Sequence, residues 1–327
     1  MNDRAPRFLI VRLGSLGDVI HAIPAAAALI HHDREARVDW IVDPRYVELV
    51  QRVERIGHVI PFDTRQGWGT LVAMARRLRG ERYDAAIDFQ GLIKSAVLAR
   101  IAGAQRTIGF TRAHLREPLA RLFYAEMHDP GDVVHVIDKG LALTRALGVH
   151  DMTVRFPLDV PPRATPDSYV LINPGAAWPN KRWPPDRFGA LAAAIRERHG
   201  LRSLVLWGPG EEAAASAVVA SSRGAAERAP ATSITDILAI AKGASLMVSG
   251  DTGPLHIAGA VGTPIVALFG PTRAERNGPW SPADISISRF DRCVCHYERR
   301  CRRDRPCFDD FTVDEVVAAV ERRVAAR

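Results

Sequence analysis

Short apolar runs alternate with stretches of helical periodicity along most of the chain. Phe8–Leu13 is an apolar run of strand length, and Val19–Ile30 then places its apolar residues on one side of a helix. The pattern continues with predicted strands at 38–42, 58–62, 83–89 and 106–109 and predicted helices at 70–79, 92–102 and 134–147. Strands that alternate with helices are typical of a parallel sheet covered on both faces.

A proline-rich connector, Phe156–Ser168, interrupts this alternation. The pattern then restarts, with predicted strands at 169–173, 203–207, 245–249 and 265–269 and predicted helices at 185–199, 211–220, 234–241 and 312–323. We therefore predict an α/β protein of two doubly wound, Rossmann-like domains, residues 1–160 and 161–327, with a cleft between them. The last helix, capped by Thr312, belongs to the second domain or packs back on the first.

Composition and charge narrow the class of protein. The chain has 327 residues, 47% of them hydrophobic, which is enough for two cores. Because no apolar run approaches the roughly 18 residues of a membrane span and the N-terminus lacks a signal peptide, we expect a cytoplasmic protein. A net charge of +7 favours acidic partners such as nucleotides, phosphorylated lipids or an anionic membrane face. Nucleic acid is not expected, since aromatic residues do not interleave with the charges.

The stretch Ser249–Thr272 contains the clearest candidate site. A buried strand leads through Gly250-Asp251-Thr252-Gly253 into a helix of small residues, with Pro254 suited to its first turn. Thr252 or Asp251 can cap that turn. The unpaired amides and positive dipole of such a helix start hold phosphate, so we predict a nucleotide-diphosphate site here. His256 lies one turn further on and either reaches the phosphates or packs in the core.

Two other loops of the second domain carry candidate groups. Lys181, between tryptophans and prolines in WPNKRWP, is placed to neutralise the charge on a departing diphosphate, the alternative being an exposed loop lysine. Glu211 and Glu212 follow a strand in WGPGEE and either accept hydrogen bonds from ribose hydroxyls or serve only as first-turn acids.

The first domain offers a loop suited to an acceptor. Gly14-Ser15-Leu16-Gly17-Asp18 follows the first strand, and Asp18 is either a helix cap or a general base for an acceptor hydroxyl. His21 lies on the same helical face and orients Asp18, replaces it, or is a packed histidine. In later loops, Lys94 and Arg116 either hold an anionic acceptor or are surface charges.

All four cysteines of the chain, Cys293, Cys295, Cys301 and Cys307, lie within fifteen residues. In a cytosolic protein such a cluster favours a metal site, but C-x-C-x5-C-x5-C is not a standard zinc spacing. A structural metal, a redox pair and plain reduced thiols remain the alternatives.

Taken together, six motifs resemble the bacterial lipopolysaccharide heptosyltransferases, family 9 of the glycosyltransferases, over nearly the whole chain. They are LGSLGDVIHAIPA, DFQGLIKSA, REPLARLFY, NKRWP, WGPGEE and SGDTGPLHIA, which begin at residues 13, 88, 116, 180, 207 and 249. The second and third are most like heptosyltransferase I, which adds the first heptose to the Kdo residue of the lipid A inner core.

The resemblance implies a GT-B fold and an inverting transfer from ADP-heptose to that Kdo residue, with no metal required and at the periphery of the inner membrane. It implies Asp18 as base and Lys181 behind the leaving group. The other implied donor residues are Thr252, Gly253, Asp251, His256, Glu211 and Glu212, and the acceptor residues are Lys94, Arg116, Ser15 and His21.

Three alternatives keep the fold or the phosphate loops but change the function. One is another family 9 enzyme that adds the second heptose or glycosylates a protein. The next is a GT-B enzyme that uses a different nucleotide sugar. The last is a non-catalytic module that binds nucleotide or lipid phosphate, which would not need Asp18.

Overall fold

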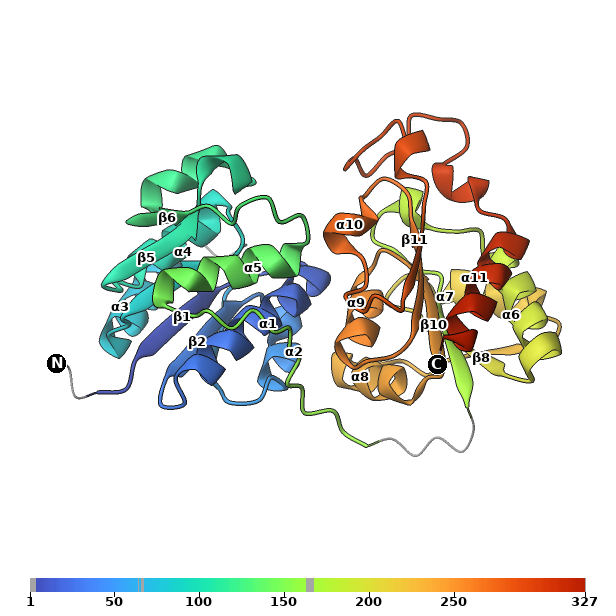
Figure 1. Cartoon of the computed structure of the whole chain (residues 1–327), viewed down its shortest axis with the longest axis horizontal. Coiled ribbons are helices and arrows are strands. Elements are labelled where there is room, and N and C mark those ends of the chain that lie inside the picture. The colour runs from blue at the N-terminus through green and yellow to red at the C-terminus, as the bar shows by residue number, and fades with distance from the viewer. Residues whose placement is uncertain (1–3, 64, 66–67, 163–167, 327) are drawn as a thin grey trace. The chain divides into compact units, whose positions relative to one another are not determined.

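The chain divides into two compact units, residues 1–159 and 160–327, in a computed structural model (Figure 1). The structure describes residues 4–63, 65, 68–162 and 168–326. Each unit has one six-stranded sheet in which all pairings are parallel. In the described residues no helix is both long and apolar enough to cross a membrane.

The first unit alternates strands and helices almost from its start. Its strands are β1 (Arg7–Val11), β2 (Arg37–Val42), β3 (Ile56–Pro61), β4 (Ala85–Asp88), β5 (Arg106–Phe110) and β6 (Glu126–His128). Its α-helices are α1 (Leu16–His32), α2 (Val47–Gln51), α3 (Trp68–Glu81), α4 (Ile93–Ile101) and α5 (Val136–Thr144). Short 3₁₀ helices include η2 (Arg112–His114) and η3 (Pro118–Phe123).

The second unit repeats this plan. Its strands are β7 (Tyr169–Asn173), β8 (Arg202–Val205), β9 (Ala226–Arg228), β10 (Leu246–Gly250), β11 (Ile265–Phe269) and β12 (Ile285–Ser288). Its α-helices are α6 (Pro185–His199), α7 (Glu212–Ser221), α8 (Ile234–Gly243), α9 (Gly253–Ala260), α10 (Ala274–Asn277) and α11 (Val313–Ala325). The 3₁₀ helix η5 (Pro179–Lys181) lies between β7 and α6.

Both sheets have the same strand order, which is that of a Rossmann fold. The orders are β3-β2-β1-β4-β5-β6 and β9-β8-β7-β10-β11-β12, so each unit runs third, second, first, fourth, fifth and sixth strand. The order reverses between the first and fourth strands, β1 and β4 in one unit and β7 and β10 in the other. Ligands of such sheets bind beyond the carboxyl ends of the strands at this switch point.

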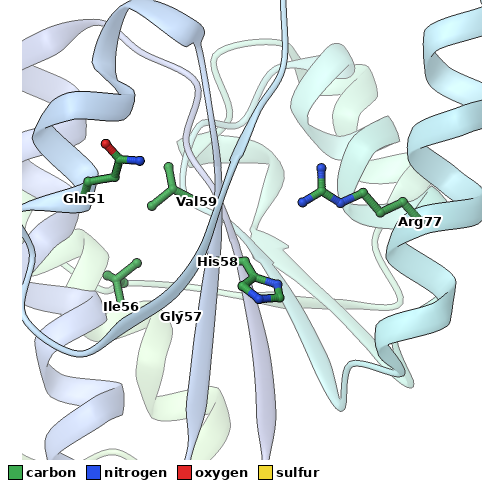
Figure 2. Close-up of a pocket in the computed structure, with 6 residues that line it drawn as sticks. All are labelled: Gln51, Ile56, Gly57, His58, Val59 and Arg77. Carbon is green, nitrogen blue, oxygen red and sulfur yellow. The ribbon is translucent and has the colours of Figure 1, made fainter.

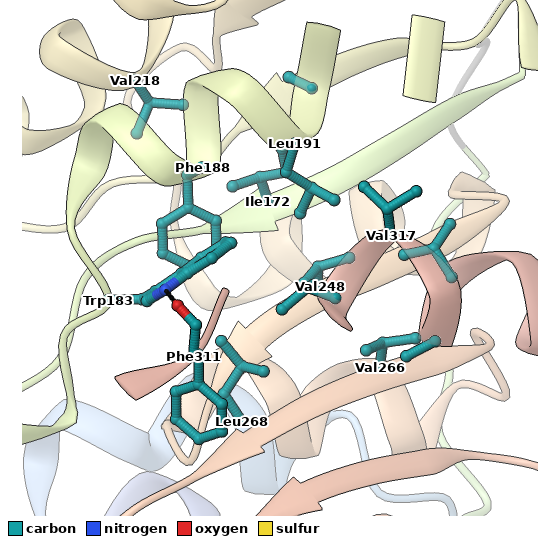
Figure 3. Packing of buried hydrophobic residues seen from close by; sticks show 14 of the residues in the cluster. Ile172, Trp183, Phe188, Leu191, Val218, Val248, Val266, Leu268, Phe311 and Val317 are labelled. Atoms are coloured by element: carbon teal, nitrogen blue, oxygen red, sulfur yellow. Dashed lines mark hydrogen bonds between the residues drawn. The ribbon is translucent and has the colours of Figure 1, made fainter. Parts of the chain in front are cut away.

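Buried apolar side chains hold helices against the sheet. In the second unit, one core joins β7, β8, β10 and β11 to α6, α7 and α11, and it contains the residues Ile172, Trp183, Phe188, Leu191, Val218, Val248, Val266, Leu268, Phe311 and Val317 (Figure 3). The Trp183 indole N–H donates to the Phe311 carbonyl at 3.1 Å and so links the segment before α6 to the segment before α11.

The last helix, α11, packs within the second unit. Val316, Val317 and Val320 on its apolar face are buried in the core beside α6. The Thr312 hydroxyl accepts the Glu315 amide at 3.2 Å, as the capping pattern predicted.

Candidate functional site

Asp251 lies at the carboxyl end of β10, on the switch point of the second unit, and its side chain is almost completely buried. Its carboxylate accepts from the Lys181 ammonium at 2.5 Å and from the Thr272 hydroxyl at 2.6 Å, and His256 Nε2 lies 3.2 Å away. Burial by itself would raise the pKa of Asp251, but the His256 hydrogen bond and the Lys181 charge hold that pKa well below its usual range. The carboxylate therefore positions the Lys181 ammonium and the His256 imidazole. The sequence had also allowed Asp251 to cap α9, and it does not.

Lys181 is the last residue of η5 and leaves only 11% of its side chain exposed. Its ammonium lies 4.5 Å from the centre of the Trp178 ring and also pairs with Asp251. The alternative of a freely exposed loop lysine is therefore wrong. A Cβ at Gly250 would lie 2.8 Å from the Lys181 carbonyl oxygen, so a glycine at the end of β10 lets this loop approach.

The start of α9 has the features expected of a phosphate site. Thr252 is its N-cap residue, with an extended backbone, and makes no side-chain cap to the first turn. Its hydroxyl instead accepts from Asn173 Nδ2 at 2.9 Å, which joins the carboxyl ends of β7 and β10. The Thr252 hydroxyl therefore does not cap the amides of this helix start, which begins at Gly253. Helix starts of this kind bind anions.

Glu211 and Glu212 differ in position. Glu211 lies just before α7, where its carboxylate accepts the Gly208 amide at 3.0 Å and lies against Gly175 beyond β7. Glu212 is exposed in the first turn of α7. Of the two, Glu211 is therefore the one brought to the switch point beside Asn173.

Asp18 lies in the first turn of α1, beyond the carboxyl end of β1, with 27% of its side chain exposed. The carboxylate accepts from the amide and the hydroxyl of Ser15, each at 3.0 Å, and pairs with the Arg12 guanidinium at 2.5 Å. Asp18 thus caps its helix and is also a partly accessible carboxylate at the switch point. Arg12 was not predicted, although a cation at the end of an apolar strand run is itself a signal.

His21 is buried on α1, with its ring edge-on to that of His135 at 5.8 Å between centroids. His135 is the N-cap residue of α5. The contact corresponds to the packed histidine that the sequence had left as an alternative.

Hydrogen bonds join the three loops of the first unit that carry acceptor candidates. Gln90, after β4, accepts the Leu13 amide at 2.8 Å, and Glu117 accepts the Ile93 amide at 2.7 Å at the start of α4. Gly91 approaches Arg116 so closely that a Cβ there would lie 3.4 Å from the Arg116 nitrogen. Lys94, one residue after Ile93, and Arg116 are both exposed at this edge.

Asp88, at the carboxyl end of β4, is hydrogen-bonded to the loop that follows this strand. It is completely buried and accepts from Tyr124 at 2.6 Å, from Ser95 at 2.8 Å and from the Gln90 amide at 2.8 Å. Burial raises the pKa of Asp88 in spite of these donors.

The four cysteines gather in the second unit as free thiols. Cys293, Cys295 and Cys307 are buried and Cys301 is partly exposed. The sulfurs of Cys293 and Cys295 lie 3.5 Å apart, and burial together with the Cys293 sulfur raises the pKa of Cys307 to about 12. Asn180, beside Lys181, donates to the Glu298 carbonyl at 2.9 Å, so the cysteine segment touches the Lys181 loop.

One shallow pocket lies elsewhere, along β3 at the edge of the first sheet. Its lining residues are Gln51, Ile56, Gly57, His58, Val59 and Arg77 (Figure 2). Asp39, His58 and Glu81 beside it are near enough to share a cation. However, Asp39 already accepts from Arg37 at 2.8 and 2.9 Å and from Tyr83 at 2.7 Å, so a guanidinium occupies the position that a metal would need.

Comparisons with known proteins by family profile, by sequence and by structure all match heptosyltransferases. The profile of glycosyltransferase family 9 (heptosyltransferase) matches residues 71–305. Lipopolysaccharide heptosyltransferase 1 of Pseudomonas aeruginosa is 28% identical over 326 residues, covering 93% of this chain and 91% of that protein.

Two solved structures of E. coli heptosyltransferase WaaC match the fold at 25% identity. The one with ADP has a TM-score of 0.78 and covers 98% of both chains. The one with ADP-2-deoxy-2-fluoro heptose has a TM-score of 0.79 and covers 96% of this chain and 99% of that one. The chain is therefore a glycosyltransferase of GT-B fold that belongs to family 9, the heptosyltransferases.

Proposed function

We propose that this enzyme transfers heptose from ADP-heptose to the Kdo residue of the lipid A inner core, with inversion at the anomeric carbon. The observation that carries the proposal is the Lys181 ammonium, held by Asp251 beside the uncapped start of α9. Similarity to heptosyltransferase 1 over nearly the whole chain supports the choice of acceptor, and the ADP-sugar complexes of WaaC support the choice of donor.

The reaction is a single displacement at C1 of the heptose. Asp18 takes the proton from the acceptor hydroxyl, whose oxygen bonds to C1 while the bond from C1 to the diphosphate oxygen breaks. The electron pair of that bond leaves with ADP. Lys181 and the first amides of α9 stabilise the negative charge that develops on the diphosphate. Asp251 does not touch phosphate in this scheme, because its role is to position Lys181 and His256.

The positions of the remaining candidate residues suggest which part of the donor or acceptor each one contacts. We propose that Glu211 accepts hydrogen bonds from the ribose of ADP and that Glu212 contributes little. Lys94 and Arg116 bind the anionic groups of the acceptor, and the hydroxyl of Ser15, which donates to Asp18, accepts a hydrogen bond from a hydroxyl of the acceptor. His21 does not contact the acceptor, and its buried ring stabilises α1 by packing against His135.

The direct test is incubation with ADP-heptose and a Kdo–lipid A acceptor, followed by mass spectrometry. We expect the acceptor to gain the mass of one heptose, and UDP- and GDP-sugars to give no product. Product only from another nucleotide sugar, or only with a heptosylated or protein acceptor, would replace the proposal with the corresponding alternative.

The base role of Asp18 has a matched control in the chain. Asp236 occupies the same place in α8, accepting from the amide and the hydroxyl of Ser233, each at 2.9 Å. Asp18→Asn should lower the transfer rate by about two to four orders of magnitude while ADP affinity stays within a few-fold, and Asp236→Asn should leave the rate unchanged. Undiminished turnover of the Asp18 variant would rule out the general base.

We propose that transfer itself needs no metal. The cysteines offer thiol ligands for a structural metal, yet no three of the four sulfurs, all in described residues, lie within 4.8 Å of one another. Metal analysis of the purified enzyme, with and without Cys301→Ser, tests this. A stoichiometric metal lost in the variant would identify a structural site, and loss of transfer on chelation would contradict a metal-free reaction.

We further propose that the enzyme works at the cytoplasmic face of the inner membrane, where a lipid-anchored acceptor is presented. The positive charge of the chain, +7, supports contact with an anionic surface.

A further inference from the structure

Most exposed large apolar side chains of the first unit belong to one stretch of its sequence. Of the ten large apolar side chains exposed among the described residues, six lie between residues 93 and 134: Ile93, Leu119, Leu122, Met127, Val133 and Val134. This stretch includes η3 and the edge strand β6 (Figure 1). Clustered exposed apolar residues mark an interaction surface more often than singly scattered ones do.

The residues of η3 divide by burial with the period of a 3₁₀ helix. Side chains three residues apart share a face in such a helix. Ala120 is fully buried and Phe123 is partly buried, so this row faces the protein, where η3 packs on α4. Leu119 and Leu122 form the next row, and they are 59% and 68% exposed. The helix therefore presents two adjacent leucines to solvent although alanine and phenylalanine already supply its packing.

Three arginines lie in η3 or close to it. Arg121 lies between the two leucines in η3, and Arg112 and Arg116 lie in or beside η2, which contacts η3. All three are exposed, and within the described part of the chain no ion pair joins them to a carboxylate. Two acidic side chains lie near these arginines: Glu117 accepts from the amide of Ile93, and Asp129 lies 3.4 Å from His114 of η2. Apolar side chains set among unneutralised cations are the pattern of a surface that enters the interface of an anionic bilayer.

The position of η3 is fixed relative to the acceptor candidates. Its N-cap residue is Glu117, whose carboxylate holds the first amide of α4, one residue before Lys94. Arg116 directly precedes Glu117, and its backbone nitrogen would lie 3.4 Å from a Cβ at Gly91. A surface bound at Leu119 and Leu122 is thus adjacent to the cations proposed to bind the acceptor.

We propose that η3 is a membrane-docking element, in which Leu119 and Leu122 insert among the headgroups of an anionic lipid bilayer and Arg112 and Arg121 contact lipid phosphates. The proposal concerns the surface beside the proposed acceptor site and does not depend on which sugar is transferred.

The test is co-sedimentation of the full chain with vesicles of phosphatidylcholine alone or with about a third phosphatidylglycerol. The leucine variant carries Leu119→Ser and Leu122→Ser. The control variant carries Val72→Ser in α3 and Val294→Ser in the second unit, whose side chains are 60% and 59% exposed. Transfer is measured with a bilayer-embedded acceptor and with an acceptor freed of its acyl chains.

We expect wild-type protein to bind the anionic vesicles and not the neutral ones. Binding by the leucine variant should be weaker by about tenfold or more, since two apolar insertions are lost, while the control variant binds as the wild type. Arg121→Gln should weaken binding by a few-fold, less so at high salt. The leucine variant should keep its transfer to the soluble acceptor and lose most of its transfer to the embedded one.

Three results would overturn the docking element: no vesicle binding by the wild type, equal binding to neutral and anionic vesicles, or unchanged binding of the leucine variant. A leucine-dependent dimer in size-exclusion chromatography would make η3 a protein interface instead. The proposed transfer is judged separately, because vesicle binding without heptose transfer to the soluble acceptor refutes only the function.

Discussion

At the scale of single residues, Asp251 is the group on which the candidate donor site most depends. We predict that Asp251→Asn lowers the stability of the second unit at pH 7 by about 3 kcal/mol, because removing one member of a buried ion pair leaves the other charge uncompensated. ADP binding should weaken as well, since Lys181 and His256 lose their common partner. Urea denaturation and calorimetric titration with ADP measure the two effects.

The sign of the pH dependence follows from the depressed pKa of Asp251. Its contribution is fully present above the unfolded pKa of about 3.9 and is lost as the pH falls towards the lower folded value. The stability gap between wild type and Asp251→Asn should therefore stay constant from pH 5 to 8 and narrow below about pH 4. Asp236→Asn, in an exposed helix cap, is the control, and a gap that widened in acid would contradict the assignment.

The residues that carry charge were easier to predict from the sequence than their contacts. Asp18 and Asp251 were singled out because each follows a predicted strand, and Lys181 because tryptophans and prolines flank it. The contacts of the Lys181 loop reach far along the chain: Lys181 and Asp251 are 70 residues apart, and Asn180 and Glu298 are 118 apart. No local pattern encodes such pairings, so the role of Asp251 became clear only in the folded unit.

At the scale of elements, the close approach of β10 to the Lys181 loop is the feature most sensitive to a small change. We predict that Gly250→Ala destabilises the second unit by about 1–3 kcal/mol and slows transfer at least tenfold, because the new methyl group would lie 2.8 Å from the Lys181 carbonyl oxygen. Gly259→Ala in α9 is the control, since its methyl group would meet only Ile265 at 3.5 Å. Thermal unfolding and steady-state kinetics compare the two, and equal behaviour would show that the loop adjusts freely.

Central elements were predicted from their patterns, and short edge elements were missed. The strands β7 and β11 and the helix α6 have the residue ranges expected, because each is a buried apolar run or a periodic stretch ended by a glycine or proline. The sequence did not predict β6 or β9, whose residues are EMH and AER. Strands of three residues at the edge of a sheet depend on backbone pairing with a neighbour, which hydrophobic patterning does not reveal.

At the scale of the whole molecule, the two units repeat one topology with different chemistry at the switch point. Each sheet reverses its order between its first and fourth strands. The loops there carry a carboxylate paired with arginine in the first unit and an ammonium paired with a buried aspartate in the second. The sequence predicted this division because the βα alternation restarts after the proline-rich connector.

Every residue proposed to hold ADP belongs to the second unit. A fragment of residues 160–327 contains a complete six-stranded sheet and its own apolar core. It should therefore fold alone and bind ADP with an affinity within about tenfold of that of the full chain, since Lys181, Asp251 and the start of α9 keep all their contacts. ADP at a hundred times its dissociation constant should stabilise the fragment by about 2.7 kcal/mol. Calorimetric titration and thermal unfolding measure both quantities, and the same fragment with Asp251→Asn should show neither. A folded fragment that fails to bind ADP would mean that the donor site needs residues of the first unit, and the assignment of ADP to this unit alone would have to be abandoned.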